Sequence, residues 1–212
     1  MIRVLIVDDH TIVRKGIQQL LEDTDDIRIE GEACRASEMF RKLDEKEFDV
    51  ILLDISLPGR SGVEALKHLK DNYPEIPVLI LSMYPEEQYA LRVMKSGASG
   101  YLTKESAPDE MVHAIRTTAR GKKYISTSLA EALAEHINGY AEKPEYKNLS
   151  DREFEVLKRI ASGQPLTEIA EHLSLSVKTI STYRSRILNK LGLNNNSDIV
   201  RYAMNHRLLN NE

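Results

Sequence analysis

The sequence predicts an α/β domain built on a parallel five-stranded sheet, followed by a second domain made only of helices. Short apolar runs alternate with segments of helical spacing over the first 120 residues, and every segment after residue 148 has helical spacing. Between the two regions lies AEKPEYKN (141–148), a polar stretch with a proline and no apolar periodicity. Strands that alternate with helices of about a dozen residues indicate βαβ units around a parallel sheet, with helices covering both faces.

The expected strands are short, continuous apolar runs, which are typical of strands buried on both faces of a sheet. They lie at 2–7, 27–33, 49–54, 77–82 and 100–103. The segments between them carry apolar residues on one helical face, as Ile12, Ile17 and Leu20 do after the first strand. Ligands of parallel α/β folds bind outside the carboxyl ends of the strands. The residues that follow each strand are therefore the candidates for a functional site.

After the sheet, the chain is expected to be helical. The run STSLAEALAEHINGY (126–140) predicts a short amphipathic helix that ends at Asn138–Gly139. Ser150 and Glu153 have the spacing of a capping box and begin the next expected helix. Gly163 ends that helix, and three more are expected near 166–173, 177–191 and 197–207. These features divide the chain into a domain at 1–121, a linker with a short helix at 122–147, and a helical domain at 148–212.

The composition excludes several classes of protein. Cys34 is the only cysteine among 212 residues, which excludes an intramolecular disulfide and a cysteine-rich metal site. No apolar stretch approaches the roughly 20 residues of a membrane span. The first residues enter a strand pattern at once, without the features of a signal peptide. We therefore expect a cytoplasmic protein that does not associate with a membrane.

Polar and charged residues stand where four of the expected strands end. Asp8 and Asp9 follow the first strand, Asp54 ends the third, Ser82 ends the fourth, and Lys104 follows the fifth. If the first and third strands are neighbours, these side chains converge at one edge of the sheet. Three carboxylates favour a hard divalent cation such as Mg²⁺. An aspartate can accept a phosphoryl group, which a lysine and a hydroxyl can stabilise. Each residue alone has a simpler explanation, since a strand-end aspartate commonly caps the following loop.

The segment EIAEHLSLSVKTISTYRSRIL (168–188) predicts a helix-turn-helix, whose second helix Ser176 can cap. Although the net charge is -4, no acidic residue occurs between Glu171 and Asp198. Such a basic stripe favours a surface that binds a polyanion. One face of the second helix combines Lys178, Ser181, Thr182, Ser185 and Asn189, with Arg184 and Arg186 on its flanks. Short polar groups over base edges and basic groups beside phosphates suit the DNA major groove. The alternative is an ordinary surface helix of a small bundle.

Residues 1–120 resemble the receiver domain of bacterial two-component response regulators, a flavodoxin-like (βα)5 fold. The resemblance implies that Asp54 is the phosphoacceptor, and that Mg²⁺ is bound by Asp8, Asp9, Asp54 and the backbone carbonyl of Ser56. It also implies that Ser82, Lys104 and Tyr101 are the family's hydroxyl, lysine and aromatic switch. The loop LPGRSG (57–62) fits the family too. Many receivers have a proline, often after a cis bond, where Glu105 stands here, so a cis bond is not expected.

Residues 149–193 resemble the LuxR-type DNA-binding domain of the NarL/FixJ family. Within that family, the run STYRSRI (181–187) is similar to the GacA/UvrY branch. The resemblance implies that the helix at 177–191 reads double-stranded promoter DNA and that the helix at 197–207 forms a dimer. The expected DNA contacts are Ser181, Thr182 and Ser185 to bases, Lys178, Arg184 and Arg186 to phosphates, and Thr179 in the first turn. Two departures from the family are Pro165-Leu166-Thr167 and Ser181, where many relatives have lysine.

The resulting hypothesis is a response regulator and transcription factor. A sensor histidine kinase would phosphorylate Asp54 in a Mg²⁺-dependent step, which would shift the receiver between two states. That shift would either free the helix at 176–190 from the receiver or promote a homodimer that binds DNA. No catalysis is expected beyond its own phosphorylation and dephosphorylation. An alternative is a DNA-binding regulator controlled by partner binding without phosphorylation. An aspartyl phosphatase would usually have a second acid where Ser56 stands, and a flavin-binding protein is suggested only by shared topology.

Overall fold

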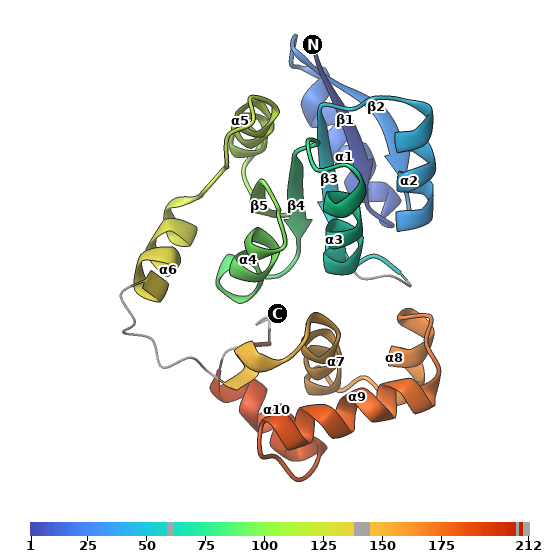
Figure 1. Ribbon diagram of the computed structural model, residues 1–212, viewed down its shortest axis with the longest axis vertical. Coiled ribbons are helices and arrows are strands. Elements are labelled where there is room, and N and C mark those ends of the chain that lie inside the picture. The colour runs from blue at the N-terminus through green and yellow to red at the C-terminus, as the bar shows by residue number, and fades with distance from the viewer. Residues whose placement is uncertain (59–61, 138–144, 207, 210–212) are drawn as a thin grey trace. The chain divides into compact units, whose positions relative to one another are not determined.

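The computed structural model of the chain describes residues 1–58, 62–137, 145–206 and 208–209. The chain divides into two compact units, Met1–Ile137 and Asn138–Glu212 (Figure 1). The first unit is an α/β domain and the second is helical, as the sequence predicts. Among the described residues, no helix has both the length and the apolar character needed to cross a membrane.

The first unit contains a five-stranded parallel sheet. Its strands are β1 (Ile2–Val7), β2 (Ile27–Ala33), β3 (Val50–Asp54), β4 (Val78–Ser82) and β5 (Gly100–Thr103). Their order in the sheet is β2-β1-β3-β4-β5, so β1 and β3 are neighbours. Every residue of β3 and β4 is buried, which explains why these strands read as continuous apolar runs. The five predicted strands are confirmed, with β3 and β4 each beginning one residue later than expected.

Helices cover both faces of this sheet. They are α1 (Thr11–Glu22), α2 (Ala36–Glu45), α3 (Gly62–Asn72), α4 (Glu86–Lys95) and α5 (Pro108–Ala119). On one face, α1 and α5 enclose a core with the strands through residues such as Ile17, Leu52 and Ile115. Right-handed crossovers in this strand order place α2, α3 and α4 on the opposite face. The carboxyl ends of β1, β3 and β5 are thereby left at one edge.

A sixth helix, α6 (Thr127–Ile137), packs against α4 within the first unit. Its start is held by Glu86, in the first turn of α4, whose carboxylate accepts a hydrogen bond of 2.6 Å from Ser126 Oγ and a second bond from Ser128. The predicted helix at 126–140 is thus observed over Thr127–Ile137, and its predicted end at Asn138–Gly139 lies outside the described residues. Residues 141–144 of the polar stretch at 141–148 lie outside them as well.

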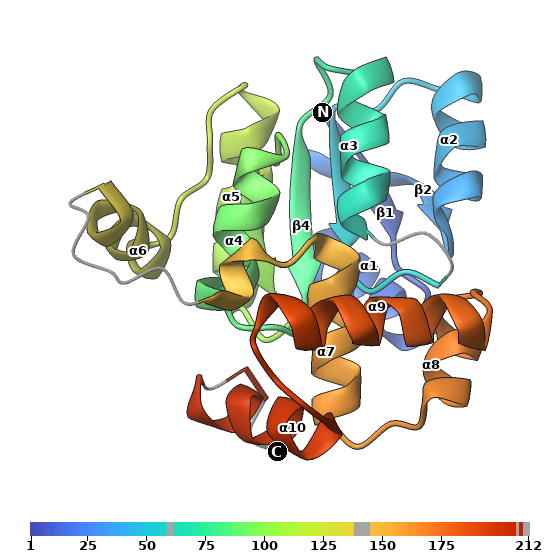
Figure 2. The same cartoon turned by 60° about the horizontal axis from the view of Figure 1, so that its bottom comes forward.

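The second unit contains a short 3-10 helix, η1 (Glu145–Asn148), and four α-helices. These are α7 (Asp151–Ala161), α8 (Leu166–His172), α9 (Val177–Lys190) and α10 (Asn196–Asn205). The helix α9 packs against both α7 and α8, while α10 packs against α7 (Figure 2). Phe154, Ile180 and Ile199 are among the fully buried side chains of this unit. The predicted helices are confirmed, with ends that differ by one or two residues.

The predicted caps of the helical unit are also confirmed. Glu153 N donates to Ser150 Oγ, and the Glu153 carboxylate accepts from Ser150 N, which completes the capping box of α7. Ser176 Oγ accepts from Thr179 N at the start of α9. Between α8 and α9, Ser174 has a φ of 52°, a left-handed conformation that favours glycine and makes the turn tight. This geometry gives a helix-turn-helix.

We expect Glu153→Gln to lower the stability of the second unit by about 1 kcal/mol at neutral pH, because a charge-assisted bond is lost. Burial raises the pKa of the Glu153 carboxyl, but bonds from Lys190 Nζ (2.6 Å) and Ser150 outweigh it and lower the pKa overall. The stabilisation is therefore present above the ordinary glutamate pKa and is lost as pH falls through the lowered value. Urea unfolding of both proteins at several pH values tests this. An equal difference at about pH 3 and at pH 7 would contradict it.

Candidate functional site

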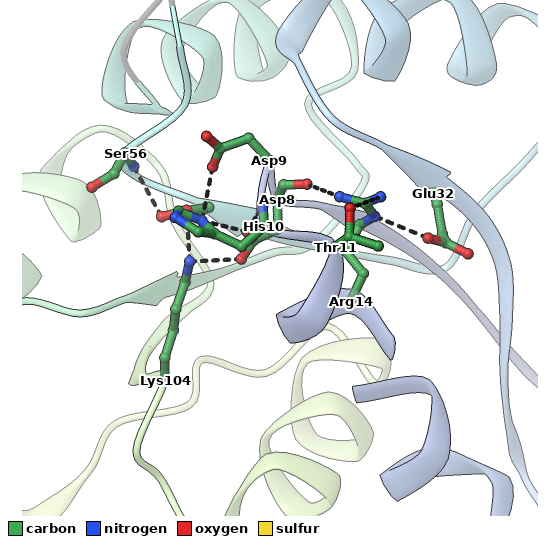
Figure 3. Close-up of polar contacts among 9 residues, drawn as sticks. Asp8, Asp9, His10, Thr11, Arg14, Glu32, Ser56 and Lys104 are labelled. Atoms are coloured by element: carbon green, nitrogen blue, oxygen red, sulfur yellow. Dashed lines mark hydrogen bonds and ion pairs between the residues drawn. The ribbon is translucent and has the colours of Figure 1, made fainter. Parts of the chain in front are cut away.

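The strand-end residues of the first unit meet in a pocket. Lys104 Nζ lies 2.7 Å from Asp8 Oδ2 (Figure 3). It also lies 2.7 Å from Asp54 Oδ2, so one ammonium group joins the ends of β1, β3 and β5. Both aspartates are almost fully buried, at 0% and 1% exposure. Asp8, Asp54 and Lys104 therefore lie together at this edge of the sheet, as the sequence predicts. They meet because β1 and β3 are neighbouring strands.

The electrostatics of this pocket depend on burial. Burial raises the pKa of the Asp54 carboxyl, and the nearby Asp8 charge adds to this, whereas Lys104 opposes it. Burial also lowers the pKa of the Lys104 ammonium, but Asp54 and Asp8 outweigh burial and raise it overall. Lys104 is thus held in its charged form between two carboxylates. Because the Lys104 side chain is the positive partner of both carboxylates, a bound cation could replace it as the partner of Asp54 or Asp8.

The pocket offers oxygen and nitrogen atoms that could hold a cation. One ligand atom each from Asp8, Asp9, His10 and Asp54 lies within 4.8 Å of all the others. Asp54 Oδ1 also accepts a 2.9 Å bond from Ser56 N, which fixes the carboxylate at the end of β3. Three carboxylates suit Mg²⁺, a hard ion that prefers oxygen ligands and retains waters. The residues present therefore fit this ion, and the Ser56 carbonyl as a further ligand stays a prediction.

Ser82 and Tyr101 lie around the loop after β4. The Ser82 hydroxyl accepts a 3.0 Å bond from Tyr84 N, and its carbonyl accepts one of 2.8 Å from Lys104 N. Tyr101 is fully buried and donates a 2.7 Å hydrogen bond to the Tyr84 carbonyl. The Tyr84 ring stacks on Tyr89 of α4, with 4.8 Å between centroids. The predicted switch residues therefore share one loop, which connects the sheet edge to α4.

Sequence reasoning missed Arg14 on α1. Its Nη1 donates a 2.7 Å bond to the Asp8 carbonyl, and its Nε pairs with Glu32 Oε2 at 2.9 Å (Figure 3). Glu32 also accepts a 2.5 Å bond from Gln18 Nε2. The guanidinium thus fixes the peptide group that joins the two acidic residues after β1. The sequence carries a signal for this contact, because Arg14 lies one turn into the helix that follows the two acidic residues.

Two further predictions concern the loops beside the pocket. The predicted loop at 57–62 is described only at Leu57, Pro58 and Gly62, and its other residues lie outside the described ranges. There is no cis peptide bond in the described parts of the chain, so the bond between Lys104 and Glu105 is trans. This agrees with the expectation from Glu105.

In the second unit, α9 presents the predicted polar face to solvent. Lys178, Ser181, Thr182, Ser185, Arg186 and Asn189 are exposed, and Thr179 and Arg184 are half-buried. Thr182 Oγ1 and Ser185 Oγ each donate a 3.0 Å bond to a carbonyl one turn earlier, so each hydroxyl hydrogen is used within the helix and each oxygen can still accept a bond. A hollow of about 290 Å³ lies along this helix, lined by residues from Ser176 to Arg186.

Arg184 has a partner within the second unit. Its Nε donates a 2.5 Å bond to Asn196 Oδ1, at the start of α10. The guanidinium therefore links α9 to α10, and a phosphate contact from it would use the remaining N–H groups. The prediction of a phosphate contact stays a prediction.

Comparison with known proteins now identifies the family. The sequence profile of the family "Response regulator receiver domain" matches residues 4–116, and that of "Bacterial regulatory proteins, luxR family" matches residues 147–203. The chain is a response regulator of the NarL/FixJ family. It is 36% identical over 213 residues to Response regulator UvrY of Escherichia coli (strain K12), which covers 100% of this chain and 98% of the relative. It is also 36% identical over 210 residues to Response regulator GacA of Pseudomonas viridiflava, covering 99% and 98%.

Solved structures agree with this assignment. The response regulator matches RcsB from Salmonella enterica serovar Typhimurium, bound to promoter rprA in the presence of phosphomimetic BeF3-, with a TM-score of 0.68 and 28% identity. That match covers 96% of this chain and 99% of RcsB. The predicted fold class is thereby confirmed, as a flavodoxin-like receiver followed by a LuxR-type DNA-binding domain. The family is one of transcription regulators.

Proposed function

We propose that this response regulator accepts a phosphoryl group on Asp54 from a sensor histidine kinase and controls transcription through α9. The observation that carries the proposal is the position of Lys104 Nζ, 2.7 Å from both Asp54 and Asp8. Buried carboxylates with a single shared ammonium form a site that can receive further charge. Asp54 Oδ1 is held by Ser56 N, which leaves the carboxylate in a fixed orientation for attack.

The proposed reaction is a phosphoryl transfer to a carboxylate. An Asp54 oxygen attacks phosphorus, the bond between phosphorus and the donor's imidazole nitrogen breaks, and that nitrogen leaves with the electron pair. The product is an acyl phosphate, and water later cleaves it to restore Asp54 and inorganic phosphate. Lys104 moves with the new charge, because the acyl phosphate oxygens replace the carboxylate as its partner. Ser82 ends β4, the strand next to β3, and would donate its hydroxyl to the group.

A bound Mg²⁺ supplies charge neutralisation for the phosphoryl oxygens. Asp8, Asp9, Asp54 and the Ser56 carbonyl would hold it. Around it, this chain's residues keep the geometry: Arg14 holds the Asp8 carbonyl, and Ser56 N holds Asp54. We also propose that phosphorylation requires this ion. The proposed domains are a receiver at 1–121, a linker at 122–147 and a DNA-binding domain at 148–212.

The proposed output is sequence-specific binding of promoter DNA by a homodimer. When Ser82 turns toward the phosphoryl group, its bond from Tyr84 N would break. The loop that Tyr84 and Tyr101 share would then change conformation and shift the start of α4. Two copies of α9 would then occupy successive major-groove half-sites, with α10 as the dimer element. The structure of RcsB bound to promoter rprA in the presence of phosphomimetic BeF3- supports promoter binding as the output. The regulator would act in the cytoplasm, where DNA and kinase meet.

The second candidate keeps the fold but omits phosphorylation, with partner binding as the signal. The test is selection of bound fragments from genomic DNA by the full-length protein, with and without a small phosphodonor and Mg²⁺. Tighter or more selective binding with the donor supports the proposal. Identical fragment sets and affinities would favour partner control instead. A colourless preparation excludes a flavin protein, and failure to turn over phosphate esters excludes a phosphatase.

We expect substitutions on α9 to separate base contacts from phosphate contacts. Thr182→Ala and Ser185→Ala are expected to cost about 1–3 kcal/mol on the selected site and little on scrambled DNA. Lys178→Ala and Arg186→Ala are expected to weaken binding to both and to reduce the salt slope by about 1 each. Fluorescence anisotropy at several salt concentrations measures both effects.

Ser162→Ala is the matched control for these variants. Ser162 Oγ donates to the Lys158 carbonyl at 3.0 Å, the same type of bond as in Ser185, but it lies at the end of α7. It is expected to leave both affinities within twofold. Loss of specific binding in this control, or an unchanged salt slope in Lys178→Ala, would contradict the assignment.

A further inference from the structure

His10 lies at the pocket, and the proposed function gives it no role. It follows the two acidic residues after β1 and is the N-cap residue of α1, where its side chain makes no capping bond. Its Nδ1 instead lies 3.0 Å from Asp9 Oδ1 and 3.2 Å from Asp8 Oδ1 (Figure 3). The imidazole is 58% exposed, so one ring edge faces the carboxylates and the remainder faces solvent.

These separations match those between ligands of a single metal ion. Bonds of about 2.1 Å in an octahedral complex place neighbouring ligand atoms about 3.0 Å apart and opposite ones about 4.2 Å apart. The observed values are 3.0 Å for His10 to Asp9 and 3.2 Å for His10 to Asp8. All four candidate ligand atoms, with that of Asp54, lie within 4.8 Å of one another. Small side-chain movements therefore bring the set to the octahedral limit.

The candidate ligand atoms differ in the hydrogen bonds and ion pairs that they already make. Asp8 Oδ1 accepts from His10 N at 2.8 Å, and Asp8 Oδ2 and Asp54 Oδ2 are held by Lys104. Asp54 Oδ1 accepts from Ser56 N. The buried Asp9 Oδ1, by contrast, faces the His10 ring. Asp9 and His10 thus form an oxygen–nitrogen pair at the more exposed side of the pocket.

We propose that His10 Nδ1 is a metal ligand beside Asp9, so that the pocket binds divalent transition ions as well as Mg²⁺. This inference rests on the proposed metal pocket. Imidazole nitrogen suits ions such as Co²⁺, Ni²⁺ and Zn²⁺, whereas Mg²⁺ prefers oxygen ligands. His10 therefore raises the affinity for the transition ions more than that for Mg²⁺. The simpler reading is that the ring only donates a hydrogen bond to the carboxylates, and the two readings differ in metal selectivity.

The test uses the full-length protein and Co²⁺, whose visible spectrum and paramagnetism report its ligands. Affinities for Co²⁺ and Mg²⁺ are measured by calorimetry for the wild type, His10→Asn and His68→Asn, counting only Co²⁺ that Mg²⁺ displaces. Asparagine is a favoured N-cap residue, so His10→Asn preserves the start of α1. His68 is the matched control: an exposed histidine on α3 whose ring packs against Phe40, with 4.8 Å between centroids.

In the wild type and His68→Asn, we expect the same ratio of Mg²⁺ to Co²⁺ dissociation constants. In His10→Asn this ratio is expected to fall at least tenfold, and the paramagnetic shift of the His10 ring protons disappears with the ring. A ratio within twofold of the wild type, or an unshifted His10 ring in Co²⁺-loaded wild type, would overturn the inference. Absence of Mg²⁺ binding in the wild type would instead overturn the proposed function, so the two failures are distinguishable.

Discussion

Asp54→Asn is expected to abolish stable uptake of a phosphoryl group, with a rate loss of at least about 1,000-fold, because an amide oxygen cannot form the acyl phosphate. The fold is expected to survive, since asparagine has the same shape and Lys104 keeps Asp8 as a partner at 2.7 Å. The measurement is intact-protein mass after incubation with a small phosphodonor and Mg²⁺. The wild type gains the mass of one phosphoryl group, and the variant does not.

Asp49→Asn is the matched control for this experiment. Asp49 precedes β3 at the end opposite Asp54 and receives three bonds from Arg3, one of 2.7 Å from its backbone N and two of 3.1 and 3.0 Å from its guanidinium. Its replacement removes an ion pair from the same strand region without touching the pocket, so phosphoryl uptake is expected to remain. Uptake that persists in Asp54→Asn at the wild-type rate would place the acceptor elsewhere. Uptake lost from both variants would point to a general loss of fold.

Gly62→Ala is expected to destabilise the first unit by about 3 kcal/mol, because the new methyl group would overlap main-chain atoms. A Cβ at Gly62 would lie 2.4 Å from the Asp54 carbonyl oxygen and 2.5 Å from Ile55 Cα. Neither atom can rotate away, so the end of β3 must shift. A displacement of about 1 Å at the acceptor would slow phosphoryl uptake roughly 100-fold. Urea unfolding and the rate of mass gain measure the two effects.

The contrasting variant is Gly16→Ala. Gly16 lies on the exposed side of α1, and a Cβ there would meet nothing within 4 Å. Alanine in a helix interior is expected to stabilise the protein by about 0.5–1 kcal/mol. Uptake should match the wild type. If Gly62→Ala proves as stable and as active as Gly16→Ala, the close approach of α3 to β3 is not a constraint on the acceptor.

The positions of the strands and the polar residues at their ends could be predicted because they rest on local patterns. Buried runs such as 50–54 need no partner to be recognised, and a carboxylate at a strand end is visible in the sequence. Adjacency of β1 and β3 then follows from the fold class. The capping box at Ser150 and Glu153 could be predicted for the same reason, since its members are three residues apart.

Contacts between residues distant in the sequence could not be predicted in this way. Arg14 reaches the Asp8 carbonyl and Glu32, and the second contact depends on how α1 lies over β2. The bond from Arg184 to Asn196 depends on the packing of α10 beside the end of α9. Periodicity assigns both arginines to a helix face. It does not indicate the distance from that face to a carboxylate, a carbonyl or an amide on another element.

The attachment of α6 to the first turn of α4 has a mechanical consequence. The Glu86 carboxylate accepts hydrogen bonds from Ser126 and Ser128, so these bonds tie the start of α6 to the start of α4. Tilting α4 alone would break these bonds, whereas tilting both together would keep them. The motion that breaks fewer hydrogen bonds is therefore a joint rotation, in which α6 follows α4, the helix next to Tyr84.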